Sequence, residues 1–136
     1  MSTSYRSIEL KRAQRGATVY QVSFKSSFLG SLGLLMSEEK ATTANEELAK
    51  AARQLDGHLM LNLIGVQILG SHFFPVIRRL AADILHYSGK WLIAINVAGG
   101  ISDVIVLAGL PVFRAPSAAA ALDAFWQDAQ QDRQSA

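Results

Sequence analysis

The sequence predicts an α/β fold: an N-terminal β-hairpin followed by alternating helices and strands around one central sheet. Three observations support this. Two alternating segments near the start flank a glycine-containing turn, two later apolar segments have the length of buried strands, and helical patterns stand between and after them. Strands that alternate with helices imply crossover connections. We therefore expect a mostly parallel sheet with the helices packed mainly on one face.

The hairpin is expected within residues 7 to 24. Ser7 to Ala13 alternates weakly, and Ala17 to Phe24 alternates cleanly between apolar and polar residues. Between them, Gln14-Arg15-Gly16 has the composition of a turn. These features predict two antiparallel strands.

Residues 25–43 form an apolar insertion. It contains the sequence FLGSLGLLM from Phe28 to Met36, in which two glycines disfavour a long helix, so we expect a loop with one helical turn. Three roles are open for it: covering the sheet, mediating self-association, or docking a partner. Membrane contact is not expected, because Phe28 to Met36 has no basic residue directly beside it. The candidate contact residues of the insertion are Phe28, Leu29 and Leu32.

The first long helix is expected to begin at a cap formed by Thr42 or Thr43. Glu46 and Glu47 would then lie in its first turn, where the helix dipole favours acidic residues. Asp56-Gly57 is the expected end. The apolar stripe that faces the sheet is expected at Ala44, Leu48, Ala51 and Leu55.

A central strand and a second helix are expected next. His58 to Ile64 is apolar on both faces, as in a strand covered on both sides, and Gly65 to Gly70 should continue it in extended form. Ser71 stands where a helix N-cap belongs, Pro75 falls in the first turn, and Ser88-Gly89 ends the helix. The inward stripe is expected at Phe73, Ile77, Leu80, Ile84 and Tyr87, with an ion pair between Arg79 and Asp83.

The last third repeats the alternation. Lys90 to Val97 is a second buried strand, Gly99-Gly100 a tight turn, and Ile101 to Ala108 a short helix with Gly109 in the C′ position. Leu110 to Arg114 gives a final strand. Ser117 should cap a last helix with Ala118, Leu122, Phe125 and Ala129 facing inward, and a polar tail at about 130–136 should fray.

Composition limits the function. The 136 residues suit a single domain, and 13 basic against 11 acidic residues give a net charge of +2, which predicts no nucleic-acid binding. There is no cysteine, the start of the chain is too polar for a signal peptide, and the longest apolar run is too short to span a bilayer. The three histidines lack the spacing of metal ligands. We expect a cytoplasmic protein without a metal, a cofactor or catalytic residues.

Three stretches together resemble the STAS domain family of bacterial anti-sigma-factor antagonists. They are LMLNLIGVQILGS (Leu59 to Ser71), GKWLIAINVAGGISDVIVLAGL (Gly89 to Leu110) and PVFRAPSAAAALDAF (Pro111 to Phe125). The resemblance implies a non-enzymatic regulatory domain that binds a protein partner, in the family a serine kinase or an anti-sigma factor. It also places Ser71 at the position that many members phosphorylate. The chain departs from the family pattern at Asn62 and Gly70, where acidic residues are usual.

The predicted site is the start of the second long helix. Free N–H groups and the positive end of the helix dipole favour a phosphate on Ser71, whose charge would repel a partner packed there. Two adjacent phenylalanines cannot both face the core, so Phe74 should be partly exposed if Phe73 is inward. The predicted partner-binding residues here are Ser71, His72, Phe73, Phe74 and Pro75.

Two alternatives stay open. The chain is either a switch of this kind or a scaffold that is never phosphorylated and that oligomerises or docks through the apolar insertion. A third class is a small-ligand binder that holds a lipid or nucleotide under the insertion.

Overall fold

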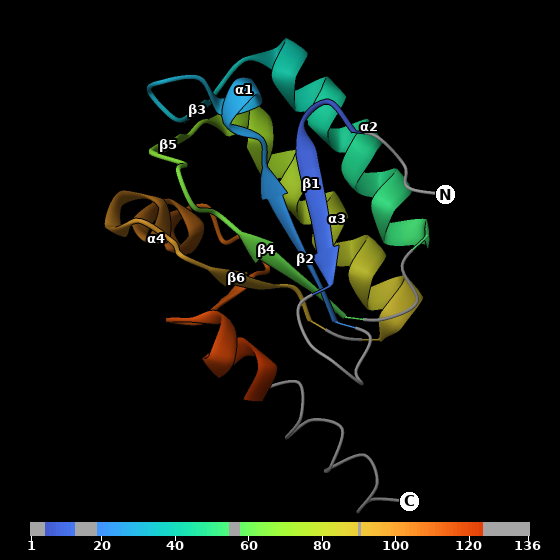
Figure 1. The fold of residues 1–136 in the computed structure, drawn as a ribbon. Coiled ribbons are helices and arrows are strands. Elements are labelled where there is room, and N and C mark those ends of the chain that lie inside the picture. Colours follow the sequence, from blue (N-terminus) through green and yellow to red (C-terminus); the bar gives the residue numbers. More distant parts are fainter. Residues whose placement is uncertain (1–4, 13–18, 55–57, 90, 124–136) are drawn as a thin grey trace, which may run out of the picture.

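The computed structural model describes residues 5–12, 19–54, 58–89 and 91–123 (Figure 1). They form a five-stranded sheet, whose strands in spatial order are β1 (Ile8–Arg12), β2 (Val19–Phe24), β4 (His58–Asn62), β6 (Ile93–Ile95) and β7 (Phe113–Arg114). β1 and β2 are antiparallel, and every later neighbour pairs in parallel. The α/β class and the mostly parallel sheet predicted from the sequence are therefore confirmed.

Each predicted strand of the main sheet is present, but β6 and β7 are shorter than expected. β1 (Ile8–Arg12) pairs with β2 (Val19–Phe24) to form the expected hairpin. β4 (His58–Asn62) lies between β2 and β6 (Ile93–Ile95), and β7 (Phe113–Arg114) is the opposite edge of the sheet. The turn predicted at residues 14–16 lies outside the described residues.

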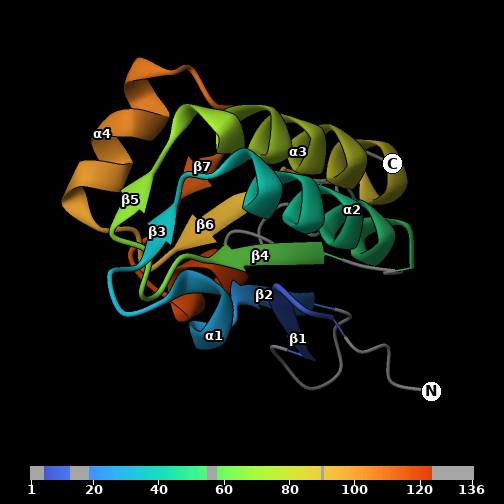
Figure 2. The same ribbon diagram turned by 90° about the horizontal axis from the view of Figure 1, so that it is seen from above.

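Two long helices cover one face of the sheet. α2 (Glu38–Gln54) and α3 (Phe74–Ser88) lie side by side on this face, as Figure 2 shows. The main core fills the space between them and the sheet. On the other face, Val19, Met60, Ile93 and Ile95 pack with Ala121 of the helical segment 118–123. Within the described residues, no helix has both the length and the hydrophobicity needed to cross a membrane.

The predicted start of α2 is wrong. The helix begins at Glu38, because the Ser37 hydroxyl oxygen accepts the Lys40 N–H over 3.1 Å and supplies the cap. The hydroxyls of Thr42 and Thr43 instead donate to backbone carbonyls one turn earlier within the helix. Its first-turn acidic residues are Glu38 and Glu39, not Glu46 and Glu47. Ala44, Leu48 and Ala51 are buried as predicted, whereas Leu55 and Asp56-Gly57 lie outside the described residues.

The insertion contains a small second sheet. The expected helical turn is α1 (Ser26–Leu29), but β3 (Leu34–Leu35) follows it and pairs in parallel with β5 (Ile68–Leu69). The predicted straight continuation of β4 is wrong, because the chain turns at Gly65, whose φ of 81° is left-handed. Two-residue strands beside glycines leave no alternating pattern, so neither strand could be predicted.

The remaining helices follow the prediction with two exceptions. The inward stripe of α3 is buried except for Tyr87, which is 48% exposed in the last turn and contacts His86. Gly99 and Gly100 are not a turn but the first residues of α4 (Gly99–Leu107). The other expected features are confirmed: the Arg79–Asp83 ion pair, the left-handed Gly89 and Gly109, and the Ser117 cap. Phe125, Ala129 and the tail lie outside the described residues.

Candidate functional site

Ser71 lies at the start of the second long helix, at the carboxyl-terminal end of the sheet. It is the first residue of a single 3₁₀ turn, η1 (Ser71–Phe73), which runs directly into α3. The predicted N-cap role of Ser71 is wrong: the Phe73 N–H donates to the Gly70 carbonyl over 3.0 Å, and this puts Gly70 in the cap position. The Ser71 side chain is exposed. It is therefore accessible to a modifying enzyme.

The residues after Ser71 separate into buried and exposed ones. Phe73 is fully buried, and its ring meets that of Phe24 edge to face at a centroid distance of 6.4 Å. Phe74 is half-buried, as expected beside an inward Phe73, and His72 and Pro75 are exposed. Phe73 is thus a core residue in this structure and offers no contact surface. We call the remaining four, Ser71, His72, Phe74 and Pro75, the helix start.

The three candidate residues of the insertion also differ in exposure. Leu29 is buried in the core. Phe28 is half-buried, and its ring stacks on that of Phe24 at a centroid distance of 6.1 Å. The Lys40 ammonium lies 5.4 Å from the centre of the Phe28 ring. Leu32 is 68% exposed. Of these three side chains, Leu32 is therefore the one that is open to a partner.

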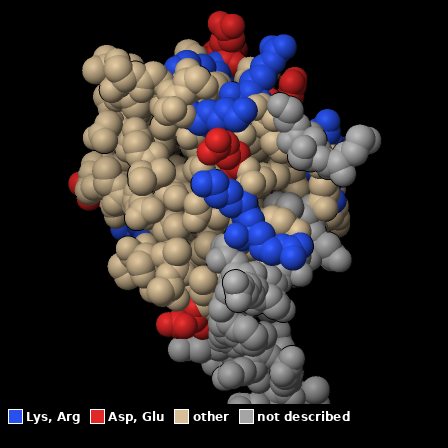
Figure 3. Space-filling model, in the orientation of Figure 1, with Lys and Arg blue, Asp and Glu red and all other residues tan. Residues whose placement is uncertain are grey.

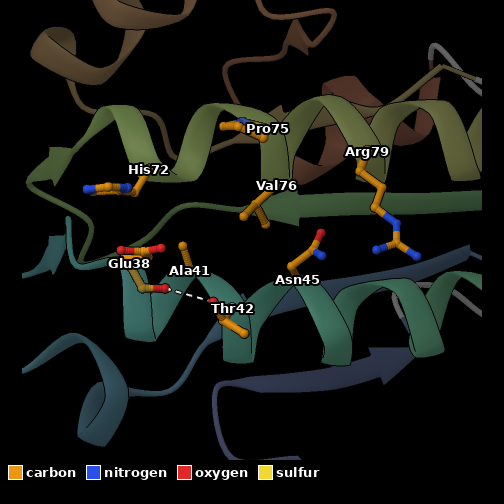
Figure 4. A pocket seen from close by; sticks show the side chains of 8 residues that line it. All are labelled: Glu38, Ala41, Thr42, Asn45, His72, Pro75, Val76 and Arg79. Carbon is orange, nitrogen blue, oxygen red and sulfur yellow. Dashed lines mark hydrogen bonds between the residues drawn. The ribbon is translucent and has the colours of Figure 1, made fainter.

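The helix start opens onto a groove between α2 and α3, which Figure 4 shows from close by. The groove has a volume of about 350 Å³. His72 and Pro75 line it from one helix, and Glu38 and Asn45 from the other (Figure 4). The complete lining is Glu38, Ala41, Thr42, Asn45, His72, Pro75, Val76 and Arg79. The sequence did not reveal this groove, since its walls come from two segments, residues 38–45 and 72–79, that are far apart in the chain.

Asn62 occupies the end of β4, where the family pattern has an acidic residue. Its side chain is 7% exposed, and its Oδ1 accepts the Ile64 N–H and the Asn96 side-chain amide, each over 3.0 Å. Asn62 is therefore engaged in holding the turn after β4 and the end of β6. An amide makes these bonds without placing a charge in the interior.

Comparisons with known proteins support the fold. No protein-family model and no curated protein matches the sequence. The structure is similar to the solved structure of an anti-sigma-factor antagonist (STAS) domain protein from Planctomyces limnophilus, with a TM-score of 0.67 and 19% sequence identity. The match covers 85% of this chain and 96% of that one. The fold implied by the three resembling stretches is thus confirmed, and the chain has the fold of a STAS domain.

Proposed function

We propose that this chain is a non-enzymatic, cytoplasmic regulatory domain that binds a protein partner through the helix start. The observation that carries the proposal is the position of Ser71. It is exposed in the first turn before α3, in a chain with the fold of a STAS domain. The partner is a serine kinase or an anti-sigma factor, as in the family that the sequence resembles.

The surroundings of Ser71 suit a protein contact. Half-buried Phe74 and exposed Pro75 supply apolar surface, and exposed His72 supplies a polar group. Aromatic anchors with polar neighbours are typical of the central part of protein interfaces. The groove between α2 and α3 begins at the same residues and adds a concave surface.

Phosphorylation of Ser71 is proposed to weaken this contact. A phosphoserine adds up to about two negative charges at neutral pH. Removing such a charge from water beneath a partner costs several kcal/mol per ion, unless the partner offers a paired cation. The unmodified hydroxyl carries no such penalty. The modification would therefore release the partner.

The test compares four forms of the full chain as bait in native cells, followed by titration with the identified kinase or anti-sigma factor. The Ser71→Ala protein should bind as the wild type does, and Ser71→Asp should bind about tenfold more weakly or worse. Ala82→Asp is the matched control, since it puts the same charge on an exposed position of α3 away from the helix start. Equal binding of Ser71→Ala and Ser71→Asp would contradict the switch.

A second candidate function is the scaffold that assembles through the insertion. It is favoured by the exposure of Leu32, an apolar side chain that the fold leaves 68% open to solvent. Light scattering of the purified chain should then show an oligomer that Leu32→Ser dissociates. A monomeric wild-type protein at high micromolar concentration counts against it.

A further inference from the structure

We propose that the partner contact extends from the helix start onto a second surface, which receives an apolar protein surface with a basic margin. This surface, the ribbon face, consists of the exposed apolar side chains around β3 and β5: Leu32, Met36, Ile64 and Ile68. The inference rests on the proposed function and deepens it, because it states the chemistry of the partner.

The ribbon face is held in place by backbone hydrogen bonds. The Gly33 carbonyl accepts the N–H groups of Gln67 and Ile68 over 2.8 and 3.2 Å, and the Gly70 N–H donates to the Leu35 carbonyl over 2.8 Å. The parallel register sets Leu35 opposite Leu69, and both are buried. Neighbouring side chains on a strand point to opposite faces, so Ile68 is directed outward. The apolar residues are therefore presented by an ordered surface.

The four side chains of the ribbon face are exposed to solvent and are not part of the core. Leu32 and Ile64 are 68% and 59% exposed, and Met36 and Ile68 are each 46% exposed. They come from two chain segments that the β3–β5 pairing brings together. A cluster of apolar side chains on one surface is typical of a protein contact, whereas single exposed ones are ordinary.

The ribbon face is continuous with the helix start. A methyl group added at Gly70 would lie 3.2 Å from the Met36 Cα and 3.3 Å from its Cγ. Met36 therefore packs directly against the residue that precedes Ser71. A partner seated on Met36 and Ile68 would reach Ser71 as well, and a phosphate at Ser71 would lie inside the contact.

The charges indicate which partner fits. Figure 3, in the orientation of Figure 1, shows few charged side chains over β5 and α4, while Lys, Arg, Asp and Glu gather over the β1–β2 side of the molecule. At the margin nearest Met36, Glu38 and Glu39 are exposed in the first turn of α2. Within the described residues Lys40 forms no ion pair with these carboxylates, and its ammonium lies over the Phe28 ring. An apolar centre with an acidic margin is complementary to an apolar surface with basic residues beside it.

The test uses two synthetic amphipathic helical peptides as probes. Both carry leucine on one face, and the other face is lysine in one peptide and glutamate in the second. Each is titrated into the full ¹⁵N-labelled chain and followed by NMR. The lysine peptide should shift the amide signals of residues 32–39, 64–68 and 71, and should bind several-fold more tightly than the glutamate peptide.

Variants locate the contact. Leu32→Ser should lower the affinity for the lysine peptide about fivefold to tenfold, as expected for an apolar residue near the centre of an interface. Leu85→Ser is the matched control, because Leu85 is 45% exposed in the last turns of α3. The Leu85→Ser protein should bind the lysine peptide as tightly as the wild type does. The double variant Glu38→Gln, Glu39→Gln should remove the preference for lysine over glutamate.

Several results would overturn the proposal: no binding of the lysine peptide, equal binding of both peptides, or equal effects of Leu32→Ser and Leu85→Ser. So would a homodimer that Leu32→Ser dissociates in the absence of peptide. The Ser71 variants distinguish a failure of the ribbon-face proposal from a failure of the proposed Ser71 switch. If Leu32→Ser does nothing while Ser71→Asp still releases the native partner, the ribbon face fails and the switch stands. If Leu32→Ser weakens the peptide while Ser71→Asp releases nothing, the ribbon face stands and the switch fails.

Discussion

The Asn96 side-chain amide donates to Asn62 Oδ1 over 3.0 Å and joins the carboxyl ends of two neighbouring parallel strands. The same oxygen accepts the Ile64 N–H, and Asn62 is almost completely buried. Asn96 has a φ of 54°, a left-handed conformation that asparagine tolerates better than most residues. The pair therefore fixes the chain where β4 and β6 end, close in sequence to the ribbon face.

The first prediction concerns this pair. Asn62→Ala removes the acceptor of two hydrogen bonds in the interior and should lower the free energy of unfolding by about 1–3 kcal/mol. Asn62→Asp keeps an acceptor oxygen for both donors but places a charge in the interior, so it should also lower the free energy of unfolding at neutral pH. Urea denaturation monitored by circular dichroism measures both. Gln67→Ala, at an exposed position, is the control. A Gln67→Ala loss as large as that of Asn62→Ala would refute the role of the pair.

The second prediction concerns Glu47, which ties the start of β1 to α2. Its carboxylate accepts the Ser7 N–H and hydroxyl over 2.8 and 2.7 Å and the Arg6 N–H over 3.0 Å. Burial raises the pKa of the Glu47 carboxyl, but the bonds from Ser7 and Arg6 and the charge of Lys25 outweigh it and hold the pKa below its ordinary value of 4.5. The charged form is therefore the one that the fold stabilises.

The sign of the pH dependence follows. Because the folded-state pKa is lowered, the stabilisation by Glu47 is complete above the unfolded-state pKa and is lost as pH falls through the folded-state pKa. The wild-type free energy of unfolding should fall with decreasing pH below 4.5, and Glu47→Gln should show a smaller fall. Glu46→Gln, at an exposed position one residue earlier, should keep the wild-type slope. Identical slopes for all three proteins would rule out this linkage.

The third prediction concerns Gly33, at the contact between the insertion and the turn after β4. Its φ is 64°, and a methyl group added there would lie 2.2 Å from the Gly65 carbonyl oxygen. Gly33→Ala should therefore lower the free energy of unfolding by more than the roughly 1–2 kcal/mol that a left-handed alanine costs. Gly89→Ala is the control, since Gly89 is also left-handed, with a φ of 71° and a ψ of 15°, but has nothing within 4 Å of the added methyl. Equal losses of unfolding free energy would show that the close contact is unimportant.

The fourth prediction separates the two adjacent phenylalanines. Phe73 is fully buried, so Phe73→Ala should cost about 3–5 kcal/mol of unfolding free energy. Phe74 is half-buried at the helix start, so Phe74→Ala should cost less stability but should weaken partner binding. Thermal denaturation and partner titration of both proteins check this. A reversed order of the two stability losses would contradict the assignment.

The periodic parts of the fold could be predicted from the sequence, and the parts that depend on distant contacts could not. The strand that ends at Asn62 follows from a continuous apolar run, and the Phe73–Ile84 stripe follows from a repeat of 3.6 residues. The start of α2 was misplaced because Thr42 and Thr43 have the composition of a cap, as Ser37 does. Only the hydrogen bonds show that Ser37 is the cap.

The candidate site also has one part that the sequence predicts and one part that depends on distant contacts. Its sequence position at Ser71 was readable from the strand, turn and helix pattern around it. The β3–β5 pairing was not, since it joins residues 34–35 to 68–69 through two-residue strands. Without that pairing, Met36 and Ile68 cannot be recognised as neighbours of Ser71. Burial also excludes Phe73 and Leu29 from the candidate contact residues. Composition alone could not distinguish them from their exposed neighbours.

The most direct test of the central claim is the dissociation constant of the identified partner for two forms of the full chain, one unmodified and one with phosphoserine incorporated at position 71. The proposal predicts that the phosphorylated form binds at least about tenfold more weakly, because the dianion would be desolvated inside the contact. An unchanged or smaller dissociation constant for the phosphorylated form would contradict it.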